Sequence, residues 1–318
     1  MLQVDRTPRL SPEAATELRD ALGRRQKELP PRWLAAFDAT TLVGRADSPT
    51  GHSRQTIERE LGLALLRDRL SEARPRGLVC LHPSASAANS ALVECLCARG
   101  SVTAIVTTEI DTTLATAMLA RLTPQSARQS SAAIRCDCSV ELPLPVRFPR
   151  PRVYLALGNV VGSASAVGAV RMLRVIRTTM TPGDSIVVGL DARRDATTSS
   201  SDADEPETAA TRHFGALELV NAATGACFDP GRFDFRATFD AENCRLETHL
   251  VARKAMHIVV PDLCDVQLRK GESIRTSVRC TFERGRVSAM MAGVGLALRE
   301  WTTDPEARFV VALASPAV

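Results

Sequence analysis

Two sets of residues that follow apolar runs could bind a ligand. Glu109 comes just after one such run, and Gly158, Asn159 and Ser163 follow another, 153–157. In open α/β sheets, ligands bind beyond the carboxyl ends of the strands. A carboxylate at the end of the second strand can accept hydrogen bonds from both hydroxyl groups of a ribose. These residues therefore predict a ribose-containing ligand at one edge of a sheet.

The segment 151–195 supplies the elements that must position the small residues. Residues 153–157 form an apolar strand pattern that stops at a Gly-Asn pair, and residues 185–190 form a second strand pattern. Between them, apolar residues recur at helical spacing and arginines fall on the opposite side. The turn at 181–184, Thr-Pro-Gly-Asp, separates this helix from the second strand. Because both strands are continuously apolar, the segment predicts a β-α-β unit with parallel, buried strands.

The rest of the chain divides into further helices and strands. Helices are predicted over 11–27, 63–73, 89–97, 112–122 and 284–293, and strands over 77–81, 102–107, 132–136, 235–239, 245–252, 256–260, 295–301 and 308–314. The last two strands are expected to pair as an antiparallel hairpin. The polar, acidic segment 196–209 lacks large apolar residues, so we expect a mobile loop that a broad-specificity protease cleaves first.

Composition excludes several classes of function. The net charge of +4 is spread over 40 basic and 36 acidic residues, and aromatic residues make up 4% of the chain, so we set nucleic-acid binding aside. The sequence shows no signal peptide and no apolar run of transmembrane length, and the odd number of cysteines indicates reduced thiols. We therefore expect a cytoplasmic protein without a membrane partner. The Cys-x-Cys pairs at 95–97 and 136–138 lack a second ligand pair at zinc spacing, so no metal is predicted.

Several segments, in the same order along the chain, resemble one known family. They are LGNVVGS (157–163), PGDSIVVGLDARRD (182–195), LVNAATGACFDPGRF (219–233), RLETHLVARKA (245–255), GESIRTSVRCTF (271–282) and AGVGLALREWTTDPEARFVVALA (292–314). From about residue 151 onward the chain resembles the histidine-specific, S-adenosylmethionine-dependent methyltransferases of ergothioneine biosynthesis, and it does so more weakly before that point. The resemblance implies an α/β fold of the class I methyltransferase type, with a Rossmann-like sheet and a discontinuous α+β substrate-binding lobe. It also implies S-adenosylmethionine as the cofactor.

The resemblance implies a set of cofactor-binding residues. Asp137 matches the family's acidic residue beside the adenine, and Cys138 would offer a backbone N–H to the ring. The loop after the first sheet strand, HPSASAANS (82–90), contains no glycine and so lacks the usual freedom to adopt positive φ. This loop is either a drifted turn that no longer binds tightly or a functional variant. The complete set is His82, Ser84, Ser86, Glu109, Asp137, Cys138 and Gly158.

The substrate pocket departs from the family pattern. The family places a Glu and a Ser two residues apart on a strand to grip imidazole, whereas these positions are Ser277 and Arg279 here. Ser163 stands in place of the Asn that would hold the substrate's α-amino and carboxylate groups, and with the pocket tyrosines missing, His52 is the nearest polar ring. Asn159 completes the predicted substrate-binding set. A guanidinium favours carboxylates, so we expect an acidic or hydrogen-bond-accepting substrate rather than histidine, unless Arg279 points to solvent.

The chain is therefore predicted to contain two domains and to act on a small molecule. Residues 62–195 and 284–318 form the S-adenosylmethionine-binding domain, and residues 1–61 and 196–283 form the substrate-binding lobe. The leading function is N-methylation of an amino acid or small amine other than histidine, by a monomer. No catalytic residue is assigned, because the reaction mainly needs an uncharged amine held in line with the methyl group. One alternative is a catalytically silent methyltransferase-like paralogue that binds a small ligand or a protein partner; another keeps the cofactor for different chemistry.

Overall fold

The protein divides into two compact units. The computed structural model describes residues 10–42, 54–69, 75–83, 86, 88–110, 112–124, 130–163, 165–192 and 206–317. Unit 1 comprises residues 1–46 and 195–278, and unit 2 comprises residues 47–194 and 279–318. The domain boundaries predicted from the sequence were 61–62, 195–196 and 283–284. The assignment of a cofactor role to one unit and a substrate role to the other stays a prediction.

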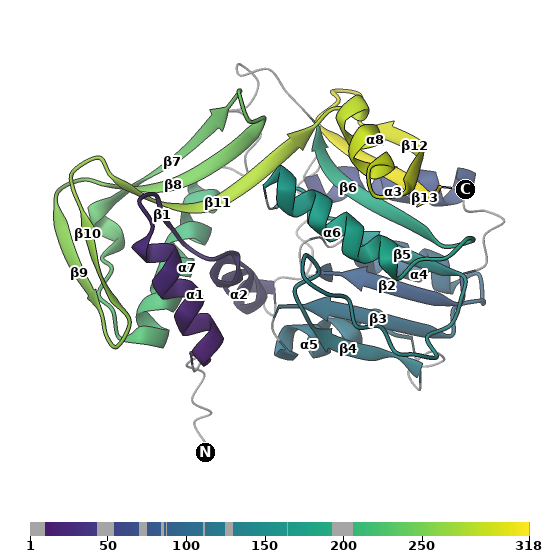
Figure 1. Cartoon of the computed structure of the whole chain (residues 1–318), viewed down its shortest axis with the longest axis horizontal. Coiled ribbons are helices and arrows are strands. Elements are labelled where there is room, and N and C mark those ends of the chain that lie inside the picture. Colours follow the sequence, from purple (N-terminus) through teal and green to yellow (C-terminus); the bar gives the residue numbers. More distant parts are fainter. Residues whose placement is uncertain are drawn as a thin grey trace. The chain divides into compact units, whose positions relative to one another are not determined.

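Unit 2 is built on a mostly parallel sheet (Figure 1). Its strands are β2 (Gly77–Leu81), β3 (Ala104–Glu109), β4 (Ala132–Arg135), β5 (Arg152–Ala156), β6 (Ser185–Ala192), β12 (Leu296–Thr303) and β13 (Phe309–Pro316). The strand order is β4-β3-β2-β5-β6, and β13 then pairs antiparallel with both β6 and β12. The predicted β-α-β unit and the antiparallel final hairpin are both present. Because the chain runs from β2 outward to β4 and then returns to β5, the strand order reverses between β2 and β5.

Helices cover both faces of this sheet. They are α3 (Arg54–Arg69), α4 (Ala88–Cys97), α5 (Thr112–Leu122), α6 (Ala166–Thr178) and α8 (Arg284–Ala292). Leu66, Leu92 and Met118 bring α3, α4 and α5 into one core with Leu155 and other alternate strand residues. Tyr154 points to the opposite face, where its hydroxyl donates to the carbonyl of Thr179 just after α6, at 3.0 Å. The buried strands therefore leave only their ends open to a ligand.

Unit 1 is an α+β unit with its own core. Its elements are α1 (Pro12–Gly23), β1 (Lys27–Glu28), α2 (Pro31–Leu42), α7 (Pro206–Thr224), a 3-10 turn (Pro230–Arg232), β7 (Phe233–Asp240), β8 (Arg245–Ala252), β9 (Met256–Val260), β10 (Cys264–Leu268) and β11 (Ser273–Phe282). β7 and β8 form one antiparallel hairpin, and β9 and β10 form another. Leu18, Trp33, Leu217 and Phe233 are among the residues that pack the helices against the strands. The end of β11 passes into unit 2, where Thr281 and Phe282 pair with β6.

The amino-terminal elements differ from the prediction. Ser11 caps the first helix by accepting from the N–H of Ala14, as expected, but the helix ends at Gly23 rather than at residue 27. The chain becomes extended there because β1 pairs with the start of β11, with Lys27 opposite Ile274. β1 and α2 were not predicted. α3 begins at Arg54 rather than at residue 63.

The predicted polar loop at 196–209 is shorter than expected at its carboxyl end. Helix α7 begins at Pro206, so the last four residues of the predicted loop are helical. Pro is favoured in the first turn of a helix, because the N–H groups there have no partner within the helix and the one that Pro lacks is not needed. This explains why α7 begins at Pro206. Residues 193–205 lie outside the described part of the chain.

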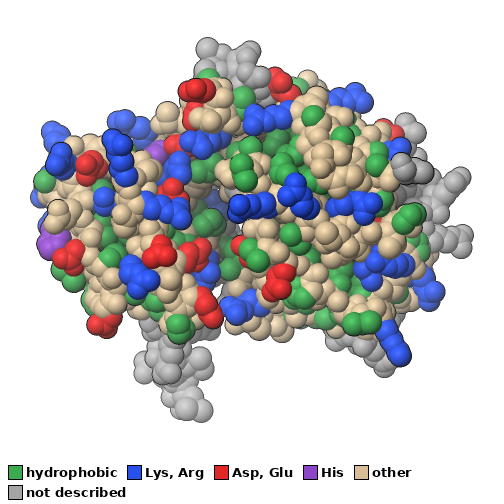
Figure 2. Space-filling model, in the orientation of Figure 1, with side chains coloured by type: hydrophobic (Ala, Val, Ile, Leu, Met, Phe, Trp, Pro, Cys, Tyr) green, Lys and Arg blue, Asp and Glu red, His purple; other side chains and the backbone are tan. Residues whose placement is uncertain are grey.

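The surface carries charges of both signs. On the face shown in Figure 2, acidic and basic side chains are interspersed. Within the described residues, none of the helices has the length and apolar content that a bilayer span requires.

Asp304 holds the turn between β12 and β13. Its carboxylate accepts from the N–H groups of Arg308 and Phe309 at 2.6 and 2.7 Å, and from Nε of Arg308 at 2.9 Å. Burial alone would raise the pKa of Asp304, but these hydrogen bonds outweigh it and hold the pKa below its usual value. The carboxylate form therefore stabilises the hairpin that closes the sheet.

We expect Asp304→Asn to lower the free energy of unfolding by about 2 kcal/mol at pH 7. A depressed folded-state pKa gives stability that is complete above the unfolded value of about 3.9 and is lost as pH falls through the folded pKa. The difference between the variant and the unmodified protein should therefore shrink below about pH 4. Urea unfolding across pH, with Asp20→Asn on the exposed face of α1 as control, measures this; a difference that does not change with pH contradicts it.

Candidate cofactor and active site

A buried carboxylate, that of Glu58 in α3, lies between the loops that follow β2 and β5, the two strands between which the strand order reverses. Its Oε2 accepts from the hydroxyl of Ser86, in the loop after β2, at 2.6 Å. Its Oε1 accepts from the N–H of Gly158, just after β5, at 2.7 Å. The residue is 3% exposed. Open α/β sheets bind ligands where the strand order reverses, so Glu58 lies at the place where the fold offers a site.

The backbone around Glu58 is shaped to admit its carboxylate. A Cβ on Gly189 of β6 would lie 1.7 Å from Oε1 of Glu58, so a larger residue there would force the carboxylate out of its present position. Gly158 has a φ of 78°, a conformation that favours glycine. The predicted cofactor residues Ser86 and Gly158 are thus brought together, and the link between them is a residue that the sequence analysis did not single out.

The glycine-free loop is held by side chains. Ser86 accepts from the N–H of Ala88 at 3.2 Å, and Nδ2 of Asn89 donates to the carbonyls of Pro83 and Ser86 at 3.2 and 3.0 Å. His82 itself adopts a positive φ of 45°. The sequence analysis expected that a loop without glycine would not adopt positive φ. That expectation is wrong at His82. Ser84 lies outside the described residues.

Glu109 ends β3, next to β2 in the sheet. It is 2% exposed, and its Oε2 lies 3.4 Å from Nδ1 of His82. The N–H of His82 donates to the carbonyl of Thr108 at 2.9 Å, which fixes the start of the loop against β3. His82 and Glu109, both predicted from the sequence, therefore meet at the carboxyl ends of adjacent strands.

Asp137 and Cys138 follow β4, the next strand along. Asp137 is exposed, and its Oδ1 accepts from the N–H of Ser139 at 2.8 Å. Cys138 is buried, with its Sγ 3.9 Å from that of Cys136 and 3.2 Å from Oγ1 of Thr108. The hydrogen bond with Cys136 and burial raise the pKa of Cys138, so this thiol stays protonated. Asp137 is thus free to face a ligand, whereas the Cys138 side chain is a packing element.

Asn159 ties the end of β5 to two other strands. With a φ of 58°, its side chain donates to Oδ2 of Asp191 at 3.1 Å and to the carbonyl of Cys280 at 3.2 Å. A Cβ on Gly162 would lie 2.2 Å from Oδ1 of Asn159, so a larger residue there would displace the Asn159 amide from its hydrogen bonds. Asn159 is 1% exposed. Asn159, which was predicted to bind the substrate, is therefore buried in this structure and links β5 to β6 and β11 by hydrogen bonds.

Arg279 is paired inside unit 2. Its Nε and Nη2 donate to Oδ2 of Asp191 at 3.1 and 2.8 Å, and its side chain is 30% exposed. Asp191 compensates the guanidinium charge, which leaves the predicted preference for an acidic substrate without its physical basis.

Ser163, another predicted substrate residue, is exposed, and its hydroxyl donates to the carbonyl of Val160 at 2.7 Å.

The structure leaves two of the predicted substrate residues as predictions. His52 lies outside the described residues. Ser277 belongs to the part of β11 in unit 1, and its role stays a prediction.

Glu58 and Asp191 are the residues of this arrangement that the sequence analysis missed. A signal for Glu58 exists: it precedes the buried Gly62 and Leu66 by four and eight residues, which places an acid within the buried stripe of a helix. A signal for Asp191 exists as well, because it closes the strand next to the one that ends at Gly158 and Asn159.

Comparison with known proteins decides the family. A model of the histidine-specific, S-adenosylmethionine-dependent methyltransferases matches residues 72–316. The chain belongs to this family. The methyltransferase is 27% identical over 299 residues to a histidine N-alpha-methyltransferase of Mycobacterium tuberculosis (strain CDC 1551 / Oshkosh), with 92% of each chain covered. It is 32% identical over 167 residues to the protein of the same name from Mycolicibacterium smegmatis, with 51% of each covered.

A solved structure shows the same fold. The CcbJ methyltransferase of Streptomyces caelestis matches with a TM-score of 0.51 at 13% identity, covering 90% of this chain and 98% of that chain. The predicted class I methyltransferase fold is thus confirmed. S-adenosylmethionine is the cofactor, in agreement with the prediction.

The residues at the sheet edge of the methyltransferase fit this cofactor. Its ribose has two adjacent hydroxyl groups, for which the buried carboxylate of Glu109 offers acceptors. Its methionine part carries positive charge, and Glu58 offers a buried negative charge at the reversal of strand order. Within the described residues, no group of three His, Cys, Asp or Glu side chains could hold a metal ion.

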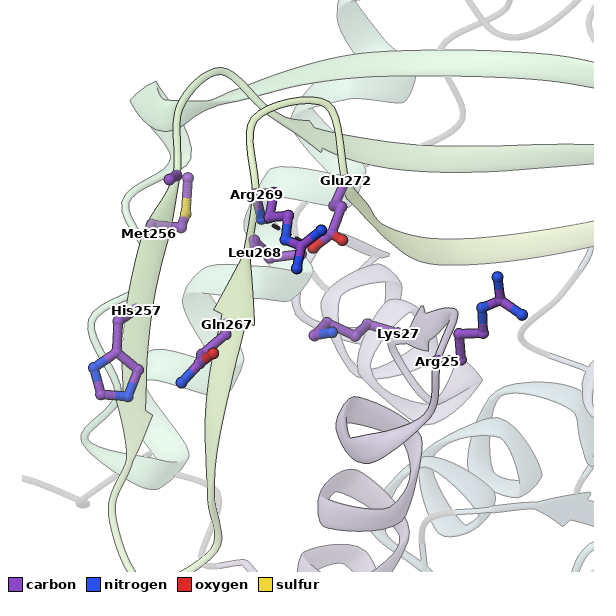
Figure 3. A pocket seen from close by; sticks show the side chains of 9 residues that line it. Arg25, Lys27, Met256, His257, Gln267, Leu268, Arg269 and Glu272 are labelled. Atoms are coloured by element: carbon purple, nitrogen blue, oxygen red, sulfur yellow. Dashed lines mark hydrogen bonds between the residues drawn. The ribbon is translucent and has the colours of Figure 1, made fainter.

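Unit 1 has a basic groove of its own. Figure 3 shows Arg25, Lys27 and Arg269 around it, with Glu272 accepting from the N–H of Arg269 at 2.9 Å. None of the predicted site residues lines it. The strand ends and buried acids that suit the cofactor all belong to unit 2.

We expect Glu109→Gln to weaken binding of S-adenosylhomocysteine by about tenfold or more, because charge-assisted hydrogen bonds to the ribose are worth about 1.5–3 kcal/mol. Isothermal titration calorimetry measures the change. Glu94→Gln, on the exposed surface of α4, is the matched control and should bind as the unmodified protein does. Equal affinity in all three proteins contradicts the assignment of Glu109.

A second expectation concerns the pair Arg279 and Asp191. In a double-mutant cycle of Arg279→Gln and Asp191→Asn, each single change should lower the free energy of unfolding, and the two should be coupled by about 1 kcal/mol. The control cycle uses Arg253→Gln and Asp234→Asn, a pair whose side chains are 56% and 58% exposed, where coupling below about 0.5 kcal/mol is expected. Additive effects at Arg279 and Asp191 rule out the stabilising pair.

Proposed function

We propose that the methyltransferase transfers a methyl group from S-adenosylmethionine to the amino group of an amino acid or small amine other than histidine. The names of the two mycobacterial relatives specify N-alpha methylation, which supports an amino nitrogen as the acceptor. The neutral Ser277 and the paired Arg279, at the two positions that the family uses to grip imidazole, argue against histidine.

The pairing of Arg279 with Asp191 is the observation that carries the proposal. An imidazole N–H is recognised best by a buried acceptor, because a ligand without that donor leaves the acceptor unpaired. Neither Ser277 nor Arg279 supplies a carboxylate. The carboxylate that pairs with Arg279, that of Asp191, already accepts from Arg279 and from Asn159. Histidine would therefore lose the interaction that distinguishes it from other amines.

The remaining residues of the site bind and orient rather than exchange protons. When bound, the cofactor supplies a methyl group on a sulfonium sulfur, an electrophile that an uncharged amine attacks directly. Such a transfer would form the N–C bond as the C–S bond broke, with S-adenosylhomocysteine as the leaving group and the product's proton released to water. The chain's contribution is to hold the cofactor at Glu109 and Glu58, to keep the turn after β5 rigid through Asn159, and to exclude water.

We expect the purified protein to methylate an amine or amino acid other than histidine, and to methylate histidine at most slowly. Methyl transfer from labelled S-adenosylmethionine is measured across the twenty amino acids and common small amines, with Arg279→Ser alongside to expose Asp191. If Asp191 then accepts an imidazole N–H, that variant should gain activity on histidine relative to the unmodified protein.

Efficient methylation of histidine by the unmodified protein would refute the specificity. Cofactor binding without transfer to any of these substrates would refute the activity and favour a binding protein that has kept the fold. Glu94→Gln serves as the control for changes in the preparation, since its side chain is exposed on α4.

A further inference from the structure

Glu58 carries a buried negative charge that the described protein does not compensate. Its two partners, the hydroxyl of Ser86 and the N–H of Gly158, are neutral donors. Among the lysine, arginine and histidine side chains that the structure describes, none forms an ion pair with it. Burying a carboxylate costs several kcal/mol, and neutral hydrogen bonds offset only part of this. A cation at this position would therefore be stabilised strongly.

The order of acids across the sheet indicates which cation it is. Asp137 follows β4, Glu109 ends β3, and Glu58 bonds to the loops after β2 and β5, and these four strands are neighbours in that order. The adenosine part of S-adenosylmethionine is uncharged, and its two positive groups lie on the methionine part. With the ribose at Glu109, the methionine part is the one that reaches Glu58.

We propose that Glu58 binds the α-ammonium group of the cofactor. An ammonium has three N–H donors for a carboxylate, whereas a sulfonium has none, so the ammonium is the better partner. The proposal also places a limit on the cofactor's own carboxylate. Ser86 and Gly158, which could otherwise donate to it, are occupied by Glu58, so that carboxylate must bind elsewhere. The proposal rests on the cofactor and not on the identity of the amine substrate.

The test compares ligands that differ in this one group. Titration calorimetry measures the binding of S-adenosylmethionine, S-adenosylhomocysteine and 5′-methylthioadenosine, of which the last lacks the amino-acid part. Glu58→Gln keeps the size of the side chain and removes its charge. We expect it to weaken binding of the first two ligands at least tenfold and to leave 5′-methylthioadenosine within about twofold. Glu109→Gln should weaken all three.

Glu60→Gln is the matched control, because Glu60 lies two residues further along α3 and is exposed. It should bind all three ligands as the unmodified protein does. The unfolding temperature of each variant without ligand shows whether it is folded. If Glu58→Gln does not fold, the unmodified protein still tests the proposal: a deaminated analogue of S-adenosylhomocysteine should bind at least tenfold more weakly than S-adenosylhomocysteine itself.

Three results would overturn the proposal. Equal losses for S-adenosylhomocysteine and 5′-methylthioadenosine would make Glu58 a structural link between α3 and the loops. A loss for S-adenosylmethionine alone would place Glu58 at the sulfonium. Unchanged binding, or no binding of any ligand to the unmodified protein, would remove Glu58 from the site. None of these readouts depends on methyl transfer, so failure of the proposed substrate class remains a separate result.

Discussion

Asn159 holds the ends of three strands in unit 2 together through one side-chain amide. It follows β5, donates to Asp191 at the end of β6 and donates to the carbonyl of Cys280 in β11. Its left-handed backbone directs the turn that begins at Gly158. The orientation of the Gly158 N–H, and through it the position of Glu58, depends on this turn. The carboxyl ends of these strands are therefore held together by a buried polar contact.

The carboxylates at this edge are used in two ways. Asp191 is compensated by Arg279 and so belongs to the framework of the protein. Glu58 accepts only neutral hydrogen bonds from its partners Ser86 and Gly158, so its negative charge is available to a ligand, whereas Glu109 lies beside His82. Because Asp191 neutralises the charge of Arg279 within the protein, this arginine need not select acidic substrates. The charge that matters for binding is the one that the chain leaves without a cation.

Much of the fold could be predicted from local sequence. The apolar runs at 77–81, 153–157 and 185–190 are buried strands, because a parallel sheet covered on both faces leaves no polar alternation. The early end of α1 and the short β1 could not be predicted, because they depend on pairing with β11, which lies about 250 residues away in the sequence. Local propensity contains no information about such a distant partner.

The positions of some candidate site residues could be predicted, because they directly follow or end an apolar strand pattern. Glu109 and Gly158 lie at strand ends as expected, and their cofactor-binding role stays a prediction. Glu58 and the partner of Arg279 were not predictable, because their roles arise from contacts across the fold: Glu58 contacts residues of two distant loops, and Arg279 meets an acid 88 positions earlier. A charged residue in an apolar helical stripe was the signal for the first. No local pattern distinguishes a paired arginine from one that faces a ligand.

A crystal structure of the protein with S-adenosylhomocysteine tests the central claim most directly, namely that the strand-order reversal in unit 2 is the cofactor site. The account predicts the ribose hydroxyls within about 3 Å of Glu109, the amino group at the same distance from Glu58, and Arg279 still bound to Asp191. A ligand carboxylate on Ser86 and Gly158 in place of Glu58, or a ligand bound in the basic groove of unit 1, would contradict it.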